Sequence, residues 1–266
     1  MSKHHFYQVD AFTSRLFAGN PAGVCQLDDW LPDATLVNIA AENCLSETAF
    51  YVPRTNGFDL RWFNRDMEVD FCGHATLATA FVLYKIKGFN GPRLQFHTRS
   101  GMLEVSKQPL GYELLFPTQK GVLTENTPAE LVEGLGGISS KEVYKSRDYM
   151  VVLPTEQDVA SVKPDFQKLE ALDTLGVIVT APGNKVDFVS RYFAPKLGIP
   201  EDSVSGAAHC ALTPYWSERL GKVEMHAHQI SPRGGEIICH FRGPNVMLVG
   251  NAQLYLEGQI HVPGET

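Results

Sequence analysis

The 266-residue chain has no uncharged hydrophobic run that approaches the roughly 18 residues needed to cross a bilayer as a helix. Its first ten residues, Met1 to Asp10, also lack the apolar segment of a secretory signal peptide. We therefore expect a cytoplasmic protein with no membrane partner.

Cysteine is scarce, and the metal-binding spacings of cysteine and histidine are missing. The five cysteines are Cys25, Cys44, Cys72, Cys210 and Cys239. Their odd number, their wide spacing and the absence of a Cys-x-x-Cys pair argue against a disulfide framework and against a zinc site. The nine histidines contain no His-Glu-x-x-His pattern. We therefore predict no metal and expect activity to survive chelators.

Positive charge is also in short supply. The chain has 23 Lys and Arg against 30 Asp and Glu, a formal net charge of -7. Binding to a phosphate backbone needs clustered basic residues, so no nucleic-acid partner is expected. The hydrophobic fraction of 44% and the charged fraction of 20% are typical of a globular protein with a sizeable core.

Alternation and aromatic content predict short strands, whereas longer apolar or amphipathic segments predict helices. Strands are expected at residues 6–12, 24–27, 48–52, 58–63 and 150–153, with a hairpin over 94–106. Helices are expected at residues 32–44, 73–85 and 128–135. The segment 73–85 is apolar nearly all round, which is typical of a buried helix.

The chain contains an internal echo, that is, an approximate repeat of one sequence pattern. Arg61-Trp-Phe63 precedes Gly73-His-Ala and a small-residue helix, and Arg191-Tyr-Phe193 precedes Gly206-Ala-Ala-His209 and another small-residue run. A Ser/Arg/Gly hairpin that ends in Glu104 or Glu236 follows each run. The pattern indicates two duplicated halves, although such short motifs also recur by chance.

If the echo is real, both buried helices begin at a glycine. A helix N-terminus carries free backbone N–H groups and a partial positive charge. Two such termini facing each other across an interface would cradle a carboxylate. A dry site of this kind suits the transfer of a proton at a carbon beside an acid group.

Four sequence motifs together indicate a resemblance to a known protein family. They are Asn20-Pro21, Ser46-Glu-Thr-Ala-Phe50, Cys72-Gly-His-Ala-Thr76 and Glu201-Asp-Ser-Val-Ser-Gly-Ala-Ala-His209. In this order, and over nearly the whole length, the chain resembles the PhzF-like proteins of phenazine biosynthesis, within the diaminopimelate-epimerase-like superfamily.

The resemblance implies an α+β fold of two similar halves, each a strongly curved sheet wrapped around a central buried helix. The active site is then expected in the cleft between residues 1–118 and residues 119–266, with the last strand able to pack on the N-terminal half. The resemblance further implies an isomerase without metal or organic cofactor, acting on a small carboxylate metabolite in a biosynthetic process. A homodimer is expected.

The resemblance also implies roles for individual residues. Glu47 is expected to carry the proton, while His74 and Asp202 bind and orient the substrate. The further substrate-binding positions implied are Asn20, Gly73, Ser205, Gly206 and Ala207.

The chain departs from the family pattern at two positions. The family commonly has Ser where this chain has Ala207, which removes a hydroxyl donor. Two-thiol epimerases of the superfamily have Cys before each helix glycine, whereas this chain has Cys72 before Gly73 but Ser205 before Gly206. A serine hydroxyl at its ordinary pKa is a poor substitute for a thiol, which argues against inversion by paired thiols.

Alternatives stay open from the sequence. The protein could be a thiol-dependent racemase that uses Cys72, or a non-catalytic metabolite-binding protein of the same fold. Cys72 could serve packing alone, His74 could be a core histidine bonded to backbone, and Asp202 could be a cap of the second helix. His209, one turn into that helix, is expected to be structural.

Overall fold

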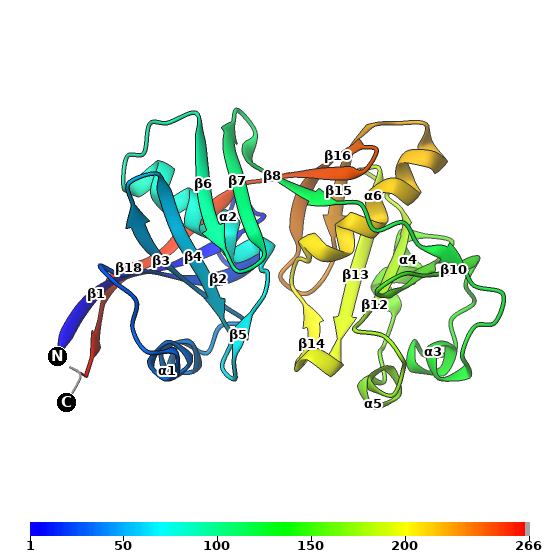
Figure 1. The fold of residues 1–266 in the computed structure, drawn as a ribbon. Helices are drawn as coiled ribbons and strands as arrows, with labels where there is room; N and C mark the ends of the chain where they lie inside the picture. The colour runs from blue at the N-terminus through cyan, green and yellow to red at the C-terminus, as the bar shows by residue number, and fades with distance from the viewer. Residues whose placement is uncertain (264–266) are drawn as a thin grey trace. The chain divides into compact units, whose positions relative to one another are not determined.

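The computed structural model describes residues 1–263, which form two compact units (Figure 1). Unit 1 contains Met1–Leu115 and the chain from Val249 onward, and unit 2 contains Phe116–Leu248. The predicted boundary between residues 118 and 119 falls close to the first of the two crossings.

The strands of unit 1 form a continuous, mostly antiparallel ladder. They are β1 (Ser2–Ala11), β2 (Asn20–Gln26), β3 (Thr48–Arg54), β4 (Gly57–Phe63), β5 (Glu68–Val69), β6 (Arg93–Thr98), β7 (Gly101–Gln108), β8 (Gly111–Pro117) and β18 (Ala252–Val262). Neighbouring strands follow the order β18-β1-β2-β3-β4-β6-β7-β8, and β2–β3 and β4–β6 are the parallel pairs. The chain passes into unit 2 within β8.

The central helix of unit 1 is α2 (Gly73–Phe81), which lies against β1, β2 and β3 (Figure 1). Every residue of α2 after Gly73 is buried, as the all-round apolar sequence predicts. Thr76 and Thr79 are tolerated there because each hydroxyl donates to the carbonyl four residues earlier, at 2.6 and 2.8 Å.

The predicted helix over 73–85 changes character near its end. After Phe81 the backbone continues as a π-helix (Val82–Ile86), and Lys87 N–H donates to Val82 O at 2.9 Å. Within this wider turn the Tyr84 hydroxyl donates to Val105 O at 3.2 Å. The turn therefore gives a buried tyrosine hydroxyl a backbone partner on β7.

Helix α1 (Asp33–Asn43) covers the other face of the unit 1 sheet. Its buried Leu36 and Ala40 belong to a cluster with Phe6, Cys25, Leu27, Phe50, Val52 and Phe63. The helix ends at Cys44, which adopts the left-handed conformation with φ 52°. This ending turns the chain toward Ser46 and Glu47, just before β3.

Unit 2 has its own strands and helices. The strands are β9 (Val122–Leu123), β10 (Glu142–Lys145), β11 (Tyr149–Val152), β12 (Val177–Pro182), β13 (Phe188–Ala194), β14 (Ile199–Asp202), β15 (Glu224–Gln229), β16 (Gly235–Arg242) and β17 (Asn245–Gly250). The helices are α3 (Ala129–Gly134), α4 (Glu156–Ser161), α5 (Phe166–Glu170) and α6 (Gly206–Leu220), with a 3₁₀ turn at Pro195–Leu197. The chain returns to unit 1 within β17.

Strand pairing repeats between the units. In unit 1, β2 and β3 are parallel, β3 and β4 antiparallel, β4 and β6 parallel, and β6 and β7 antiparallel. In unit 2, β11–β12, β12–β13, β13–β15 and β15–β16 follow the same sequence of directions. Short strands β5 and β14 each pair with the strand before them and lead to a buried helix. The echo in the sequence therefore marks a duplicated α+β half.

Helix α6 contains Pro214 and stays unbroken. Proline has no N–H, so the Cys210 carbonyl loses its helical partner. The Gln119 N–H donates to that carbonyl at 3.0 Å. Trp216 of the same helix stacks on Phe188 at 5.6 Å and donates to Thr180 Oγ1 at 2.9 Å, which fixes the helix on β12 and β13.

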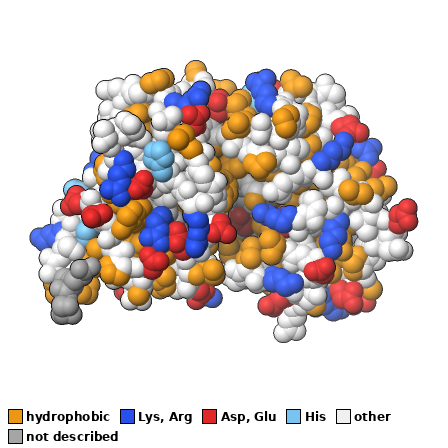
Figure 2. Space-filling model, in the orientation of Figure 1, with side chains coloured by type: hydrophobic (Ala, Val, Ile, Leu, Met, Phe, Trp, Pro, Cys, Tyr) orange, Lys and Arg blue, Asp and Glu red, His pale blue; other side chains and the backbone are white. Residues whose placement is uncertain are grey.

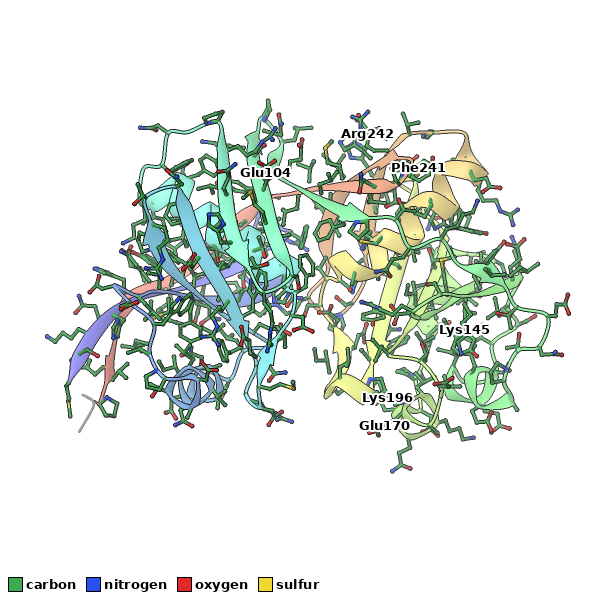
Figure 3. All side chains as sticks on the ribbon, viewed as in Figure 1. Glu104, Lys145, Glu170, Lys196, Phe241 and Arg242 are labelled. Atoms are coloured by element: carbon green, nitrogen blue, oxygen red, sulfur yellow. The ribbon has the colours of Figure 1, made fainter. Side chains whose placement is uncertain are left out.

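Two lysine side chains donate hydrogen bonds to backbone carbonyls just after α5 (Phe166–Glu170). The Lys196 ammonium donates to Leu172 O at 2.8 Å and the Lys145 ammonium donates to Asp173 O at 2.9 Å; both lysines are labelled in Figure 3. Cations near the last carbonyls of a helix compensate their partial negative charge.

The surface carries both signs of charge. Figure 2 shows acidic and basic side chains interspersed over the visible face of each unit. Within residues 1–263, none of the helices is both long enough and apolar enough to cross a membrane.

Candidate active site

Glu47 immediately precedes β3 and follows the turn that ends α1. Its backbone is fixed because the Gly23 N–H on β2 donates to Glu47 O at 3.1 Å. The side chain is 13% exposed, so the carboxylate is sheltered but accessible.

His74 is the second residue of α2 and contacts Glu47 directly. Its Nε2 lies 3.3 Å from Glu47 Oε2 and 3.3 Å from Ser46 Oγ. Burial lowers the pKa of His74, and the negative charge of Glu47 opposes this effect without reversing it. The imidazole is therefore neutral near pH 7, so one ring nitrogen donates and the other accepts.

Cys72 precedes α2 and is its N-cap residue, with extended backbone and no side-chain cap bond. Its carbonyl accepts from the Thr76 N–H at 3.1 Å, which anchors the residue to the first turn. The sulfur lies 3.4 Å from His74 Nδ1. The histidine ring therefore lies between a thiol and a carboxylate, and its contacts are with side chains rather than with the backbone bond considered as an alternative.

The equivalent helix start in unit 2 has a serine at the same place. Ser205 is the N-cap of α6, and its hydroxyl accepts from the Ala208 N–H at 3.2 Å. Gln229 holds this turn: its Oε1 accepts from the Ser205 N–H at 2.9 Å and its Nε2 donates to Asp202 O at 2.7 Å. The loop that leads into α6 is thus tied to β15.

The interpretation of Asp202 as a cap of the second helix is wrong. Asp202 is the last residue of β14 and pairs with Tyr192 on β13. The cap is Ser205, because it immediately precedes Gly206 and its hydroxyl reaches the N–H three residues on. Asp202 belongs to unit 2 and Glu47 to unit 1, as predicted; that they line one cleft stays a prediction.

The remaining predicted residues lie at element starts. Gly73 and Gly206 are the first residues of α2 and α6, and Ala207 is half-buried in the first turn of α6. Asn20 begins β2 and is 2% exposed. The preceding Gly19 has φ 68°, and a Cβ there would lie 2.1 Å from Ala11 O, so this turn requires glycine.

His209 has the structural role expected of it. It is fully buried, and its Nδ1 donates to Ser205 O at 2.7 Å. Burial lowers its pKa to about 4, while the hydrogen bond to Ser205 acts in the opposite direction. The neutral ring therefore fastens the first turn of α6 to its cap residue.

The echoed arginines of the sequence form matching ion pairs in the two units. Arg61 on β4 pairs with Glu68 on β5 at 2.7 Å and lies 4.9 Å from the Phe63 ring. Arg191 on β13 pairs with Glu201 on β14 at 2.7 Å and lies 4.9 Å from the Phe193 ring.

Each arginine therefore fixes the short strand that leads into a buried helix. The spacing from arginine to glutamate, seven residues in unit 1 and ten in unit 2, was the signal that could have revealed these pairs.

Glu104, which ends the first echoed hairpin, is not part of the site. It lies on β7 and pairs with Arg93 at 2.6 Å, with both side chains largely exposed (Figure 3). Ser46, which stands in one of the family motifs, and Gln229 also contact site residues, but the sequence assigned neither a role because their partners are distant in the chain.

Comparisons with known proteins agree with this arrangement. A model of the phenazine biosynthesis-like protein family, PhzC-PhzF, matches residues 9–258. An uncharacterized isomerase of Pseudomonas aeruginosa is 47% identical over 256 residues, covering 96% of this chain and 98% of the relative. An uncharacterized isomerase of Halalkalibacterium halodurans is 42% identical over 258 residues, covering 96% of this chain and 97% of the relative.

A solved structure gives the same result for the fold. The crystal structure of a PhzF-family phenazine biosynthesis protein from Enterococcus faecalis superposes with a TM-score of 0.94 at 45% identity, covering 98% of this chain and 100% of that one. The duplicated halves, the Glu47–His74 pair at the start of α2 and these similarities agree: the chain belongs to the PhzF family of phenazine biosynthesis-like proteins.

Proposed function

We propose that the protein is an isomerase that moves a proton on a small carboxylate-bearing metabolite, with Glu47 as the proton carrier and without a metal or an organic cofactor. The observation that carries the proposal is the 3.3 Å contact between Glu47 and the neutral His74 at the start of a buried helix. The relatives named as isomerases support the reaction class.

In the proposed reaction Glu47 takes a proton from a carbon beside the substrate carboxylate. The electron pair of the broken C–H bond delocalises toward the carboxylate and gives an enolate-like intermediate. Glu47, now a carboxylic acid, returns the proton to another position of the same molecule, so the atoms and charge of the substrate are conserved. No oxidant or reductant is required.

His74 orients the substrate or stabilises the developing negative charge. Its neutral state suits this role, because a neutral imidazole donates one hydrogen bond without holding Glu47 in a permanent ion pair. A donor placed where charge develops contributes about 3 kcal/mol to transition-state stabilisation in comparable sites.

Each glycine-led helix start is proposed as a binding position for a substrate carboxylate. The N–H groups after Gly73 and Gly206 supply donors, and the helix dipoles favour an anion. Asp202 orients the substrate, with Asn20, Ser205 and Ala207 as further binding positions. Ala207 supplies no hydroxyl, so we expect its contacts with substrate to be apolar.

The test is proton exchange in heavy water with a panel of small carboxylates. The wild-type protein should incorporate deuterium into at least one of them or convert it to an isomer, as seen by proton NMR. Glu47→Gln should abolish incorporation, whereas Glu104→Gln, which alters an exposed carboxylate of the same unit, should not. Equal activity in Glu47→Gln and wild type would refute the role of Glu47.

A second candidate function is a thiol-dependent racemase. It is favoured by the 3.4 Å approach of the Cys72 sulfur to His74 Nδ1, which offers the thiol a base. Loss of turnover in Cys72→Ala with retention in Glu47→Gln would establish this alternative. A non-catalytic metabolite-binding protein would bind carboxylates, but neither the wild type nor either variant would exchange a proton.

The homodimer is proposed from the family resemblance, and the compartment from the lack of a membrane-spanning run and of a signal segment. A homodimer in the cytoplasm, acting in a biosynthetic process, is proposed. Sedimentation of the purified protein at several concentrations would give the mass of the dimer or of the single chain.

A further inference from the structure

Three side chains at the start of α2 bring together donors of different kinds. The ligand atoms of Glu47, Cys72 and His74 all lie within 4.8 Å of one another. Among residues 1–263 no other group of three His, Cys, Asp or Glu side chains meets this condition. Thiolate, imidazole and carboxylate are the donors that zinc prefers in proteins.

The distances between donors suit a tetrahedral ion. His74 Nε2 lies 3.3 Å from Glu47 Oε2 and 3.9 Å from Cys72 Sγ. Zinc bonds of about 2.0 Å to nitrogen and oxygen and about 2.3 Å to sulfur place tetrahedral ligands roughly 3.3 and 3.6 Å apart. The carboxylate–imidazole separation therefore fits, whereas the sulfur must move closer to Nε2, and all three donors, which lie within 4.8 Å of one another, must close around the ion.

Hydrogen bonds fix the backbone of all three residues. Cys72 and His74 belong to the first turn of α2, where Cys72 O accepts from both the N–H and the hydroxyl of Thr76. Glu47 is tied to β2 through Gly23 N–H. The side chains of all three are also largely buried, so the donors have little freedom to lose when an ion binds, which favours affinity.

The three residues leave a fourth position for water or a substrate oxygen. We propose that Glu47, Cys72 and His74 form a binding site for a soft divalent cation, Zn²⁺, whose occupation switches the enzyme off. Binding replaces the thiol proton of Cys72 by the metal and releases that proton to solvent, with no change of oxidation state. The bound ion occupies the lone pairs of Glu47 that would accept the substrate proton.

The inhibition rests on the proposed function of Glu47, whereas the binding of the cation does not. This separates the two proposals experimentally. It also agrees with the expectation that chelators leave activity intact, because the ion inhibits and takes no part in the reaction.

Direct binding is tested with Co²⁺, which occupies zinc sites and reports its ligands by absorption. Chelator-treated protein titrated with Co²⁺ should bind one equivalent and develop the near-ultraviolet thiolate-to-cobalt charge-transfer band, and added Zn²⁺ should remove that band. Cys72→Ser should lose the band and weaken Zn²⁺ binding, measured calorimetrically, by at least about 100-fold, since even residues around the ligands change affinity ~10–100-fold.

Cys44→Ser is the matched control. Cys44 is an exposed thiol outside the donor set, so its replacement should leave the band and the affinity unchanged. Thermal unfolding in the presence of chelator checks that Cys72→Ser is folded. If it is not, Glu47→Gln provides the second test, because it should keep the charge-transfer band and bind Zn²⁺ more weakly.

Binding of Co²⁺ without a thiolate band, or a band that disappears in Cys44→Ser and persists in Cys72→Ser, would overturn the site. Failure of one equivalent of Zn²⁺ to suppress proton exchange in an active preparation would overturn the inhibition. Zinc binding by a protein that exchanges no proton would refute the proposed function and leave the cation site intact. Proton exchange by a protein that does not bind zinc would refute the cation site and leave the proposed function intact.

Discussion

Glu47 and Cys72 contact the two nitrogens of one histidine, and their replacement distinguishes the two proposed chemistries. We predict that Glu47→Gln lowers turnover by about 10²–10⁴-fold, the usual contribution of a positioned acid–base group. Cys72→Ala should lose far less, because the thiol takes no part in the proposed transfer. Turnover of an identified substrate, measured by NMR, checks both, and unfolding curves that match wild type show that the fold is intact.

The buried histidines predict a pH dependence of stability. The pKa of His209 is about 4 in the folded protein, below the ordinary value of 6.5, and burial lowers that of His74 as well. Between pH 6.5 and 4 the unfolded chain therefore binds more protons than the native state, and stability is lost as the pH falls. Linkage gives about 3 kcal/mol for His209 across this range.

Urea unfolding at pH 7, 6 and 5 measures this effect. The free energy of unfolding should fall with pH in the wild type and fall less steeply in His209→Gln, which has no titrating ring at this position. Equal slopes in the two proteins would contradict the assignment. His209→Gln is expected to be less stable at pH 7 because it disturbs the bond to Ser205 O.

At the scale of elements, the two arginine–glutamate pairs hold the strands that feed α2 and α6. Arg191 is 9% exposed and also donates to Val162 O at 2.8 Å and Val159 O at 3.2 Å. We predict that Arg191→Met destabilises the protein by about 3–5 kcal/mol, because Glu201, whose side chain is 14% exposed, and these carbonyls lose their partner.

Arg93→Met is the control for this prediction. Arg93 pairs with Glu104 on the surface, where the two side chains are 55% and 40% exposed, so its loss should cost at most about 1 kcal/mol. Chemical unfolding of both variants measures the difference. Similar destabilisation by the two changes would show that the Arg191 pair has no special structural role.

Local patterns predicted the elements close to the site. The hairpin over 94–106, the buried helix from Gly73 and the helix over 32–44 follow from periodicity and turn residues, and β6, β7, α2 and α1 confirm them. The role of Asp202 could not be read in the same way, because Ser205 and Asp202 are both good capping residues. Pairing with Tyr192, a long-range contact, decides between them.

For the whole molecule, the echo predicted the duplication, but the strand order required contacts that no local pattern contains. β1 pairs with β18 from Ala11↔Ala252 to Ser2↔Val262, across almost the entire chain. Gln229 reaches back to Ser205 and Asp202 in the same manner. The family motifs singled out Glu47 and His74 as site residues, but their direct contact, the contact of Ser46 with His74 and the arginine pairs are tertiary contacts that the motifs do not contain.

Glu47 lies in unit 1 and Asp202 in unit 2, and each unit alone provides one glycine-led helix start. We predict that both residues act on the same substrate molecule. Asp202→Asn should weaken binding of the carboxylate that Glu47 turns over, and it should do so without changing the position of proton exchange. Ala207→Ser adds a hydroxyl to the first turn of α6 and should change the affinity for that same ligand. Ser231→Ala removes a hydrogen bond to Ser203 O and should change the affinity less.

Calorimetric titration of one carboxylate against these three variants measures the effect. If Asp202→Asn binds and turns over the ligand as the wild type does, the two units do not share a substrate. The same conclusion would follow from a ligand-bound crystal structure in which the Glu47 and Asp202 carboxylates lie on different faces of the molecule. Retained binding with lost turnover would instead place Asp202 among the groups that orient the substrate for Glu47, because orientation affects the transition state more than the ground state.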